Sequence, residues 1–310
     1  MSGRVLVTGG GGFVGRPLLG ELVKRGFDVH AVDCVARPHQ AGVTWHLCDL
    51  LETSGHCPLM DRIAPSHLLH LAWYVEHGKF WTAPENEIWR SVSLDLVRAF
   101  AQSGGQRAVL VGSCAEYDWK RSDEAPWRET DPCRPVLPYG IAKHALHRDV
   151  AAEADRSGIS FAWARLFLMF GEGENPQRLV PSVISALASG VPLDMSTGRQ
   201  VRDFSDTRDI AAGLSALLAA GHVEGAVNVA SGEGHSLREL CAIIADLAGK
   251  SGENLRFGAL PDRDEPPFMV ADVTRLREEV GFTPPESLRQ RLSSIVRERL
   301  ALSPSPVRGA

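Results

Sequence analysis

Three side chains of this sequence, Ser113, Tyr139 and Lys143, could together carry out acid–base chemistry. Tyr139 and Lys143 are four residues apart, so on a helix they would lie on one face, about one turn apart. A free tyrosine has a pKa of about 10, which makes it a poor proton donor or acceptor at neutral pH. A fixed cation nearby favours the phenolate and lowers that pKa. The spacing therefore indicates a tuned general acid or base, but it also arises by chance, so its meaning depends on the elements around it.

A glycine-rich turn near the N-terminus supplies such a context. The β-branched run at residues 4–8 predicts a buried strand, and a helical pattern follows the glycines. Glycines between a strand and a helix let the backbone approach a pyrophosphate, which binds at the positive N-terminus of the helix. The glycines fit two registers, which begin at Gly9 or at Gly10 and share Gly12 and Gly15. These residues alone do not decide between the registers.

An acidic residue, Asp33, ends the second predicted strand at residues 28–32. It stands about 20 residues past the glycine turn, where a carboxylate can accept hydrogen bonds from the adenosine ribose diol and repel a 2′-phosphate. Arg37 follows on the same segment and could instead hold a 2′-phosphate. The sequence therefore favours NAD as the cofactor and leaves NADP possible.

Length and composition predict a globular chain with a full core. The 310 residues include 44% hydrophobic residues, and the net charge of −5 gives no reason to expect nucleic acid. No apolar stretch approaches the length of a membrane span, and no leader-like segment is recognisable at the start. The six cysteines include no Cys-x-x-Cys pair. We expect a soluble cytoplasmic protein with no disulfide, no nucleic-acid partner and no membrane partner.

Predicted strands alternate with helices through the first two thirds of the chain, which indicates an α/β fold with a doubly wound parallel Rossmann sheet. Pro138 suits a helix start and places Tyr139 in the first turn. The strand at residues 108–112 delivers Ser113 to the carboxyl edge of the sheet, where ligands bind. The predicted organisation is an NAD(P)-binding domain at 1–170, to which 206–230 return, a smaller substrate-binding lobe at 171–205 and 231–300, and a loose tail at 301–310.

Together these features resemble the extended short-chain dehydrogenase/reductase family, in its branch of nucleotide-sugar epimerases, dehydratases and reductases. The resemblance covers nearly the whole chain. It favours the glycine register that begins at Gly9, and it implies that Ser113, Tyr139 and Lys143 are catalytic. The residues that it implies for cofactor binding are Gly9, Gly12, Phe13, Val14, Gly15, Asp33, Asp49, Leu50, Leu71, Ala72, Trp73, Tyr139 and Lys143.

The resemblance also implies a nucleotide-sugar substrate. Arg202 begins an Arg-Asp-Phe signature whose arginine usually meets substrate phosphate in the family. Arg178 and Arg263 are further diphosphate candidates, because a guanidinium binds phosphate in a bidentate manner. Ser113 would also bind the substrate. The family often pairs two long helices with those of a second copy, so a homodimer is expected.

The implied chemistry is hydride transfer to or from a sugar carbonyl. Hydride addition creates an alkoxide, which needs a proton and a hydrogen-bond donor. Tyr139 would supply the proton, and Ser113 would hold the same oxygen. Lys143 would lower the pKa of Tyr139 and hold the nicotinamide ribose.

The residues after Ser113 argue against dehydration. The family's dehydratases place acidic residues directly after this position, where the chain has Cys114 and Ala115. Glu116 comes one residue later; it could touch substrate hydroxyls or cap the loop. Cys114 is better explained as a small buried side chain than as an acid or base.

A 4-epimerase and a 4-ketoreductase remain. Asp33 favours an epimerase with retained NAD. Leu168 and Ser91, where family members usually have asparagine, and the aromatic segment 73–81 favour a deoxysugar 4-ketoreductase. We predict 4-keto reduction of an NDP-4-keto-6-deoxyhexose, with an NDP-sugar 4-epimerase as the alternative and a redox-inert dinucleotide sensor as the third hypothesis.

Two histidines, His144 and His147, share the helix face beyond Lys143. Metal sites in proteins need at least a third ligand. None is evident near them in the sequence, so no metal site is predicted.

Overall fold

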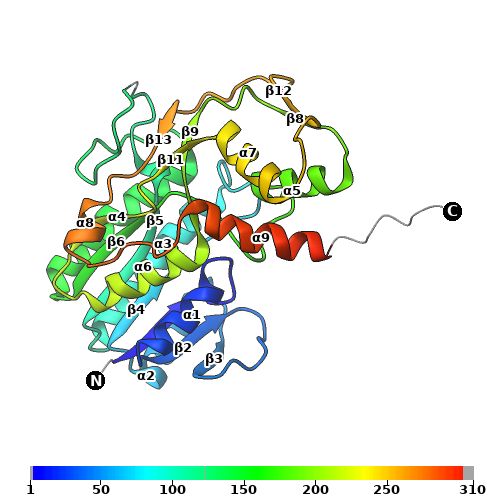
Figure 1. The fold of residues 1–310 in the computed structure, drawn as a ribbon. Coiled ribbons are helices and arrows are strands. Elements are labelled where there is room, and N and C mark those ends of the chain that lie inside the picture. Colours follow the sequence, from blue (N-terminus) through cyan, green and yellow to red (C-terminus); the bar gives the residue numbers. More distant parts are fainter. Residues whose placement is uncertain (1–2, 122, 303–310) are drawn as a thin grey trace.

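The computed structural model describes residues 3–121 and 123–302 (Figure 1). In chain order the elements are β1 (Arg4–Thr8), α1 (Gly15–Lys24), β2 (Asp28–Asp33), β3 (Val43–Leu47), α2 (His56–Ile63), β4 (His67–His70), α3 (Glu85–Gln102), β5 (Arg107–Ser113), α4 (Pro138–Ser157), β6 (Ser160–Leu166), β7 (Leu168–Phe170), α5 (Leu179–Ser189), β8 (Leu193–Met195), β9 (Val201–Asp206), α6 (Thr207–Ala219), β10 (Gly225–Val229), β11 (Gly234–Ser236), α7 (Leu237–Leu247), β12 (Leu255–Phe257), β13 (Phe268–Met269), α8 (Thr274–Glu278) and α9 (Leu288–Leu302). Short 3₁₀ turns lie at Thr53–Gly55 and Cys114–Glu116.

A seven-stranded sheet with the order β10-β6-β5-β4-β1-β2-β3 forms the larger part of the molecule. Every neighbouring pair in it is parallel. The strand order reverses where β1 meets β4, and open α/β sheets bind their ligands outside the carboxyl ends of the strands at such a reversal. The predicted doubly wound fold is confirmed.

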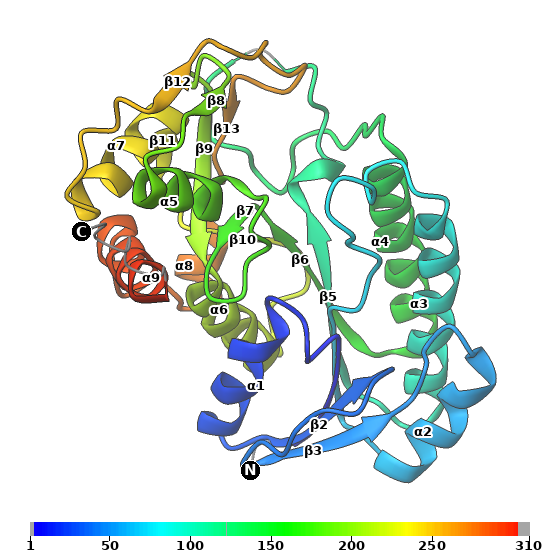
Figure 2. The ribbon, with the colours of Figure 1, turned by 90° about the vertical axis from the view of Figure 1, so that its right-hand side faces the viewer.

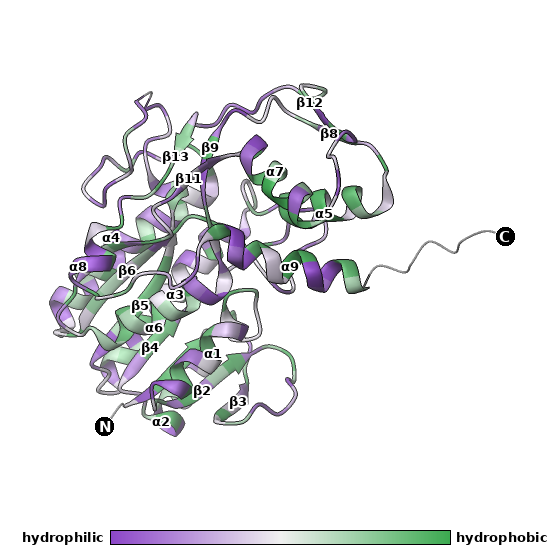
Figure 3. Cartoon of the chain, in the orientation of Figure 1, coloured by the Kyte–Doolittle hydropathy of each residue, from purple (hydrophilic) through white to green (hydrophobic). Residues whose placement is uncertain are grey.

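Helices cover both faces of this sheet. Figure 2 shows α2, α3 and α4 on one face and α1 with α6 on the other. The alternation of β1 explains how one strand serves both layers: Val5 and Val7 join the apolar cluster under α1 and α6, whereas Leu6 joins the cluster under α3 and α4. Figure 3 shows that hydrophobic residues concentrate along the strands of the sheet. The sheet is therefore buried on both faces.

A third apolar cluster lies between α5, α7 and α9, whereas Met269 of β13 and Leu276 of α8 join the cluster under α1 and α6. Strands β11, β9 and β13 form a second sheet, in which β7 also pairs with β9. The chain returns to the large sheet at residues 206–230, because α6 packs on α1 and β10 pairs with β6. Helix α9 includes residues 301 and 302 of the predicted tail; residues 303–310 lie outside the described residues.

Within the described part of the chain, no helix combines the length and the apolar character that crossing a membrane requires.

Gly15 stands where the turn after β1 leaves no room for a side chain. A Cβ there would lie 2.2 Å from the carbonyl oxygen of Gly9, and only an opening of the turn would relieve that contact. We predict that Gly15→Ala lowers the free energy of unfolding by about 1–3 kcal/mol. It should also weaken dinucleotide binding, because the same turn would have to cradle the pyrophosphate. Urea denaturation and a fluorescence titration with NADH measure the two effects.

Gly20→Ala is the matched control in the same helix. Nothing lies within 4 Å of a Cβ at Gly20. Alanine is the better helix former by about 1 kcal/mol, so this variant should be as stable as the wild type or slightly more stable. Equal losses of stability in the two variants would contradict the close approach at Gly15.

Candidate active site

Strand β5 delivers Ser113 to the carboxyl edge of the sheet, where the 3₁₀ turn Cys114–Glu116 begins. The Ser113 Oγ accepts a hydrogen bond from the backbone N–H of Ala115 at 3.2 Å, and the Ser113 N–H donates to Glu116 Oε1 at 2.8 Å. These reciprocal bonds are a capping box. The turn thus fixes the serine hydroxyl at the end of the strand.

Tyr139 lies in the first turn of α4, as predicted, because Pro138 occupies the helix start. Aromatic side chains surround its ring in edge-on contacts, with centroid distances of 4.9 Å to Phe80, 5.6 Å to Trp81 and 6.5 Å to Trp73. Burial raises the pKa of Tyr139, and a hydrogen bond with Ser113 lowers it by less. The expected lowering of this pKa is therefore wrong for this structure, since burial outweighs every neighbouring charge. Tyr139 is a protonated phenol.

Lys143 is buried one turn further along α4. Its Nζ donates to the backbone oxygen of Val111 at 2.8 Å and lies 3.7 Å from the centroid of the Trp73 ring. Burial lowers the pKa of Lys143 to about 7, against the opposing charge of Glu116. A cation on an aromatic face is stabilised by the ring quadrupole, so Trp73 holds the ammonium against β5.

Glu116 has no exposed surface. Besides Ser113, its carboxylate accepts a hydrogen bond from Trp163 Nε1 at 2.8 Å and pairs with Arg165 Nε at 3.2 Å. Both partners come from β6, and no pattern in the sequence pointed to them. Of the two roles left open for Glu116, the structure shows the loop-capping one.

Cys114 is 8% exposed, and burial raises the pKa of its thiol to about 12. A thiol with that pKa is neutral and a poor acid or base at neutral pH. This agrees with the interpretation of Cys114 as a buried filler.

The glycine turn after β1 has the geometry of the register that begins at Gly9. Gly9 has a φ of +69°, and its carbonyl oxygen accepts a hydrogen bond from Gly12 N–H at 3.0 Å. Val14 occupies the N-cap of α1 without a side-chain cap. In the first turn of α1 the Arg16 N–H donates to the Gly12 carbonyl oxygen at 3.1 Å, and Pro17 has no N–H. What this helix end offers a pyrophosphate is therefore mainly the positive end of the helix dipole and the close approach of the glycine backbone.

Asp33 and Arg37 form an ion pair of 2.7 Å beside the glycine turn. A Cβ on Gly11 would meet both side chains within 2.5 Å, so they lie directly over the turn. Two further residues that the resemblance implies for cofactor binding differ in burial: Asp49 is exposed and Leu50 is buried.

Hydrogen bonds fix the segment that follows β4 and contains Leu71, Ala72 and Trp73. His70 is bonded through Nδ1 to Thr8 Oγ1 at 2.7 Å and through Nε2 to Ser93 Oγ at 2.8 Å. Burial lowers the pKa of His70 to about 3, so its ring is neutral and serves as one donor and one acceptor. These bonds join β1, β4 and α3, and no sequence motif pointed to them.

Trp73 itself is anchored by its indole N–H, which donates to Asn86 Oδ1 at 2.8 Å. Asn86 is buried near the start of α3 and donates in turn to the carbonyl oxygens of Phe80 and Ala83. The aromatic segment is therefore bound to α3 at both ends.

Each of the three predicted phosphate-binding arginines lies near an acidic side chain. Arg202 is 4% exposed, and its guanidinium lies 3.2 Å from Glu265. Arg263 is exposed and lies 3.8 Å from the same carboxylate. Arg178 precedes α5 and lies 3.7 Å from Glu174, on the side of Tyr139, whose pKa its charge lowers. Phosphate contacts by these arginines stay a prediction.

The chain belongs to the NAD-dependent epimerase/dehydratase family, whose model matches residues 5–230. The resemblance to extended short-chain dehydrogenases/reductases is thereby confirmed, and the protein is an enzyme of this family.

Known relatives span nearly the whole chain. It is 26% identical to a UDP-glucose 4-epimerase of Streptomyces lividans, over 92% of both chains. It is 28% identical to a dTDP-6-deoxy-L-talose 4-dehydrogenase (NAD(P)(+)) of Kitasatospora kifunensis, over 93% of this chain and 92% of that one. The structure of a Thermus thermophilus UDP-glucose 4-epimerase in complex with NAD superposes with a TM-score of 0.83 at 25% identity, covering 95% of this chain and 98% of that one. The relatives thus include more than one reaction.

The buried amine of Lys143 predicts a dependence of stability on pH. Its pKa is about 7 in the fold and 10.5 in an exposed lysine, so above pH 7 the unfolded chain binds more protons than the folded one. The free energy of unfolding should therefore rise between about pH 7 and pH 8.5, a window that lies below the titration of most cysteines and tyrosines. Lys143→Met should flatten this rise, as urea denaturation at several pH values would show. Parallel profiles for the two proteins would contradict a lowered pKa at Lys143.

Proposed function

We propose that this enzyme reduces the 4-keto group of an NDP-4-keto-6-deoxyhexose by hydride transfer. The aromatic enclosure of Tyr139 supports the proposal most strongly. Phe80 and Trp81 stand edge-on to the Tyr139 ring, and Trp81 contacts Trp119 at 5.9 Å. A 4-epimerase must let its keto intermediate rotate to present both faces, whereas a reductase holds one face toward the hydride donor. The aromatic side chains packed beside Tyr139 leave little room for the sugar to rotate, which favours a single orientation of the substrate.

The apolar character of the wall favours a deoxysugar. A pocket beside it is lined mainly by apolar residues, among them Trp81, Ala115, Trp119 and Leu137, with the charged residues Asp118, Lys120 and Arg134 also in its lining. Leu168 on β7 is half-buried. A methyl group at carbon 6 loses less hydration in such surroundings than a hydroxymethyl group, whose hydroxyl needs a hydrogen-bond partner.

The mechanism assigns one task to each catalytic side chain. The turn from Gly9 to Gly15 would hold NADH or NADPH, which would supply the hydride for carbon 4 and leave as NAD⁺ or NADP⁺. The carbonyl π electrons move onto O4, and Tyr139 transfers its phenolic proton to that oxygen. Ser113 Oγ donates a hydrogen bond to O4 as its charge develops. Burial suits this direction, because it keeps Tyr139 protonated before the hydride moves.

Lys143 would hold the nicotinamide ribose. To do so its Nζ must exchange the Val111 carbonyl and the Trp73 face for ribose hydroxyls. For the adenosine ribose, Asp33 supports NAD as the cofactor. Arg37, paired with Asp33 at 2.7 Å, is placed to take a 2′-phosphate, so we propose that NADP also binds. Arg202 would release Glu265 to bind the substrate diphosphate.

The reductase proposal predicts net consumption of cofactor. On a panel of 4-keto-6-deoxy nucleotide sugars, the wild type should oxidise NADH or NADPH steadily, as followed by absorbance. Tyr139→Phe should lower kcat by roughly 100- to 10,000-fold, because the proton donor is lost, with cofactor binding retained. Tyr74→Phe is the matched control: Tyr74 hydrogen-bonds Glu76 at an exposed position and should leave kcat unchanged.

Two results would refute the reductase. Interconversion of 4-hydroxyl epimers with bound NAD and no net NADH oxidation would establish the 4-epimerase instead. Ligand binding by a wild type that turns over no sugar would establish the dinucleotide sensor.

We propose that the enzyme is a homodimer paired through α3 and α4. Ile88 on α3 and Ile141 on α4 are 53% and 47% exposed, an apolar pair on the outer face of these helices. Light scattering should give twice the chain mass of 33.6 kDa. Ile88→Asp should shift the mass toward one chain, and a wild-type mass of one chain would refute the dimer.

A further inference from the structure

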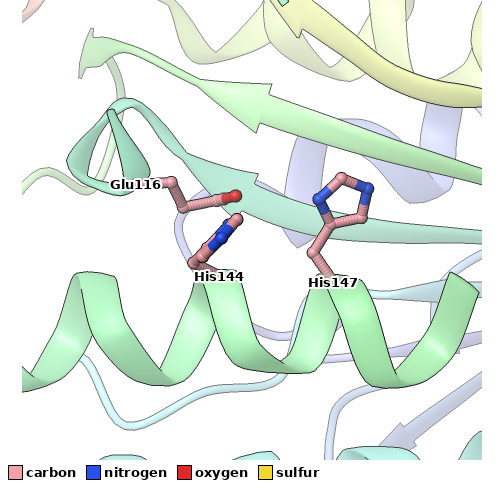
Figure 4. Close-up of side chains that lie close together, drawn as sticks. All are labelled: Glu116, His144 and His147. Atoms are coloured by element: carbon pink, nitrogen blue, oxygen red, sulfur yellow. The ribbon is translucent and has the colours of Figure 1, made fainter. Parts of the chain in front are cut away.

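Three metal-binding side chains meet beside the turn that carries Ser113 (Figure 4). His144 and His147 lie on one face of α4, and Glu116 reaches toward both rings from the turn after β5. One ligand atom from each side chain lies within 4.8 Å of the other two. The two histidines alone predicted no metal site, and the fold supplies the third ligand.

Two polar atoms of this cluster lack a hydrogen-bond partner among the described residues. Within residues 3–121 and 123–302, the Nδ1 atoms of His144 and His147 are among the few buried side-chain atoms without a hydrogen-bond partner. A buried polar atom left without a partner costs about 1–3 kcal/mol. A ligand bound between these two nitrogen atoms and the Glu116 carboxylate would remove that cost.

We propose that Glu116, His144 and His147 bind a divalent transition-metal ion of the zinc class, through two imidazole nitrogens and one carboxylate oxygen. Zinc takes these ligands at about 2.0–2.2 Å and readily keeps a fourth position for water. Ligand atoms of one such ion stand roughly 3–4 Å apart, so the side chains must close by about 1 Å.

The imidazoles are ready to act as ligands at neutral pH. Burial lowers the pKa of His144 and lowers that of His147 to about 3. Metal binding requires the neutral ring, and here no proton has to be displaced. The ring of His147 also stacks on Trp163 at a centroid distance of 5.0 Å and an interplanar angle of 13°, which fixes its orientation.

Arg165 sets the strength of the site. Its Nε lies 3.2 Å from Glu116 Oε2 and competes with a cation for the carboxylate. The same guanidinium also donates to the Glu129 carbonyl oxygen and to Cys133 Sγ, both at 3.1 Å, so it stays anchored if Glu116 turns. The ion is therefore held more weakly than in a closed structural site. Its proposed ligand Glu116 is also bonded directly to the predicted catalytic serine, since Glu116 Oε1 accepts a hydrogen bond from the Ser113 N–H.

Metal titration of the full-length protein tests the site without any assay of activity. The protein is prepared without a histidine tag, stripped with a chelator and titrated with Co²⁺, followed by visible absorption, and with Zn²⁺, followed by calorimetry. One equivalent should bind, and X-ray absorption of the zinc-loaded wild type should show two imidazoles in the coordination sphere.

Variants locate the ion. His144→Gln and His147→Gln should each weaken binding by roughly 100-fold, because each removes one ligand. His222→Gln is the matched control, since His222 is exposed and bonds only weakly to the Glu279 carbonyl at 3.2 Å. Circular dichroism and NADH binding establish that the variants are folded. If neither variant folds, the imidazole count in the wild type decides.

Three outcomes would overturn the proposal. Absence of saturable binding would mean that the cluster holds water only. Binding that survives both variants would place the ion elsewhere, for example at the His30–His46 pair, whose ring nitrogens are 2.8 Å apart. Fewer than two imidazoles on the zinc of the wild type would exclude the ligand set.

Discussion

The buried ion pair between Glu116 and Arg165 is the interaction on which the site depends. It joins the turn after β5 to β6, in a region where neither side chain reaches water. A buried pair offsets its desolvation only when its polar atoms find further partners, and Trp163 Nε1 and the Ser113 N–H also donate to this carboxylate. Loss of one partner would leave an uncompensated charge in the core, at a cost of about 3–5 kcal/mol. The position of Ser113 is thus secured by the electrostatics of the sheet interior.

Burial acts in opposite directions on the pKa values of Tyr139 and Lys143, the two predicted catalytic residues of α4. It raises the pKa of Tyr139 and lowers that of Lys143, because it disfavours the charged form of each. Aromatic rings pack against both side chains, Trp81 against Tyr139 and Trp73 over Lys143; the Trp73 ring favours the ammonium form of Lys143 but does not offset its burial. Both side chains therefore favour their neutral forms: the Tyr139 phenol keeps its proton, and the Lys143 amine is less readily protonated than that of an exposed lysine.

The elements that local patterns encode could be predicted from the sequence. The strand–glycine–helix unit, the start of α4 at Pro138 and the Tyr139–Lys143 spacing each depend on neighbours in the chain. The partners of Glu116 could not be predicted from the sequence. Arg165 reaches Glu116 only because β5 and β6 pair in a register that places Gly112 opposite Arg165. The burial of Arg202 against Glu265 depends in the same way on segments far apart in sequence.

The pairing of Asp33 with Arg37 has a consequence for the metabolism that this enzyme serves. A partly exposed ion pair contributes roughly 0–1 kcal/mol, so little free energy holds the two side chains together. With the Asp33 carboxylate turned toward the adenosine ribose, the fold would take its electrons from NADH, the catabolic carrier. With the Arg37 guanidinium turned there, it would take them from NADPH, the biosynthetic carrier. A substitution of Arg37 would remove the guanidinium and leave Asp33 to repel a 2′-phosphate, so a change of cofactor preference would be encoded at this one pair, at the end of β2.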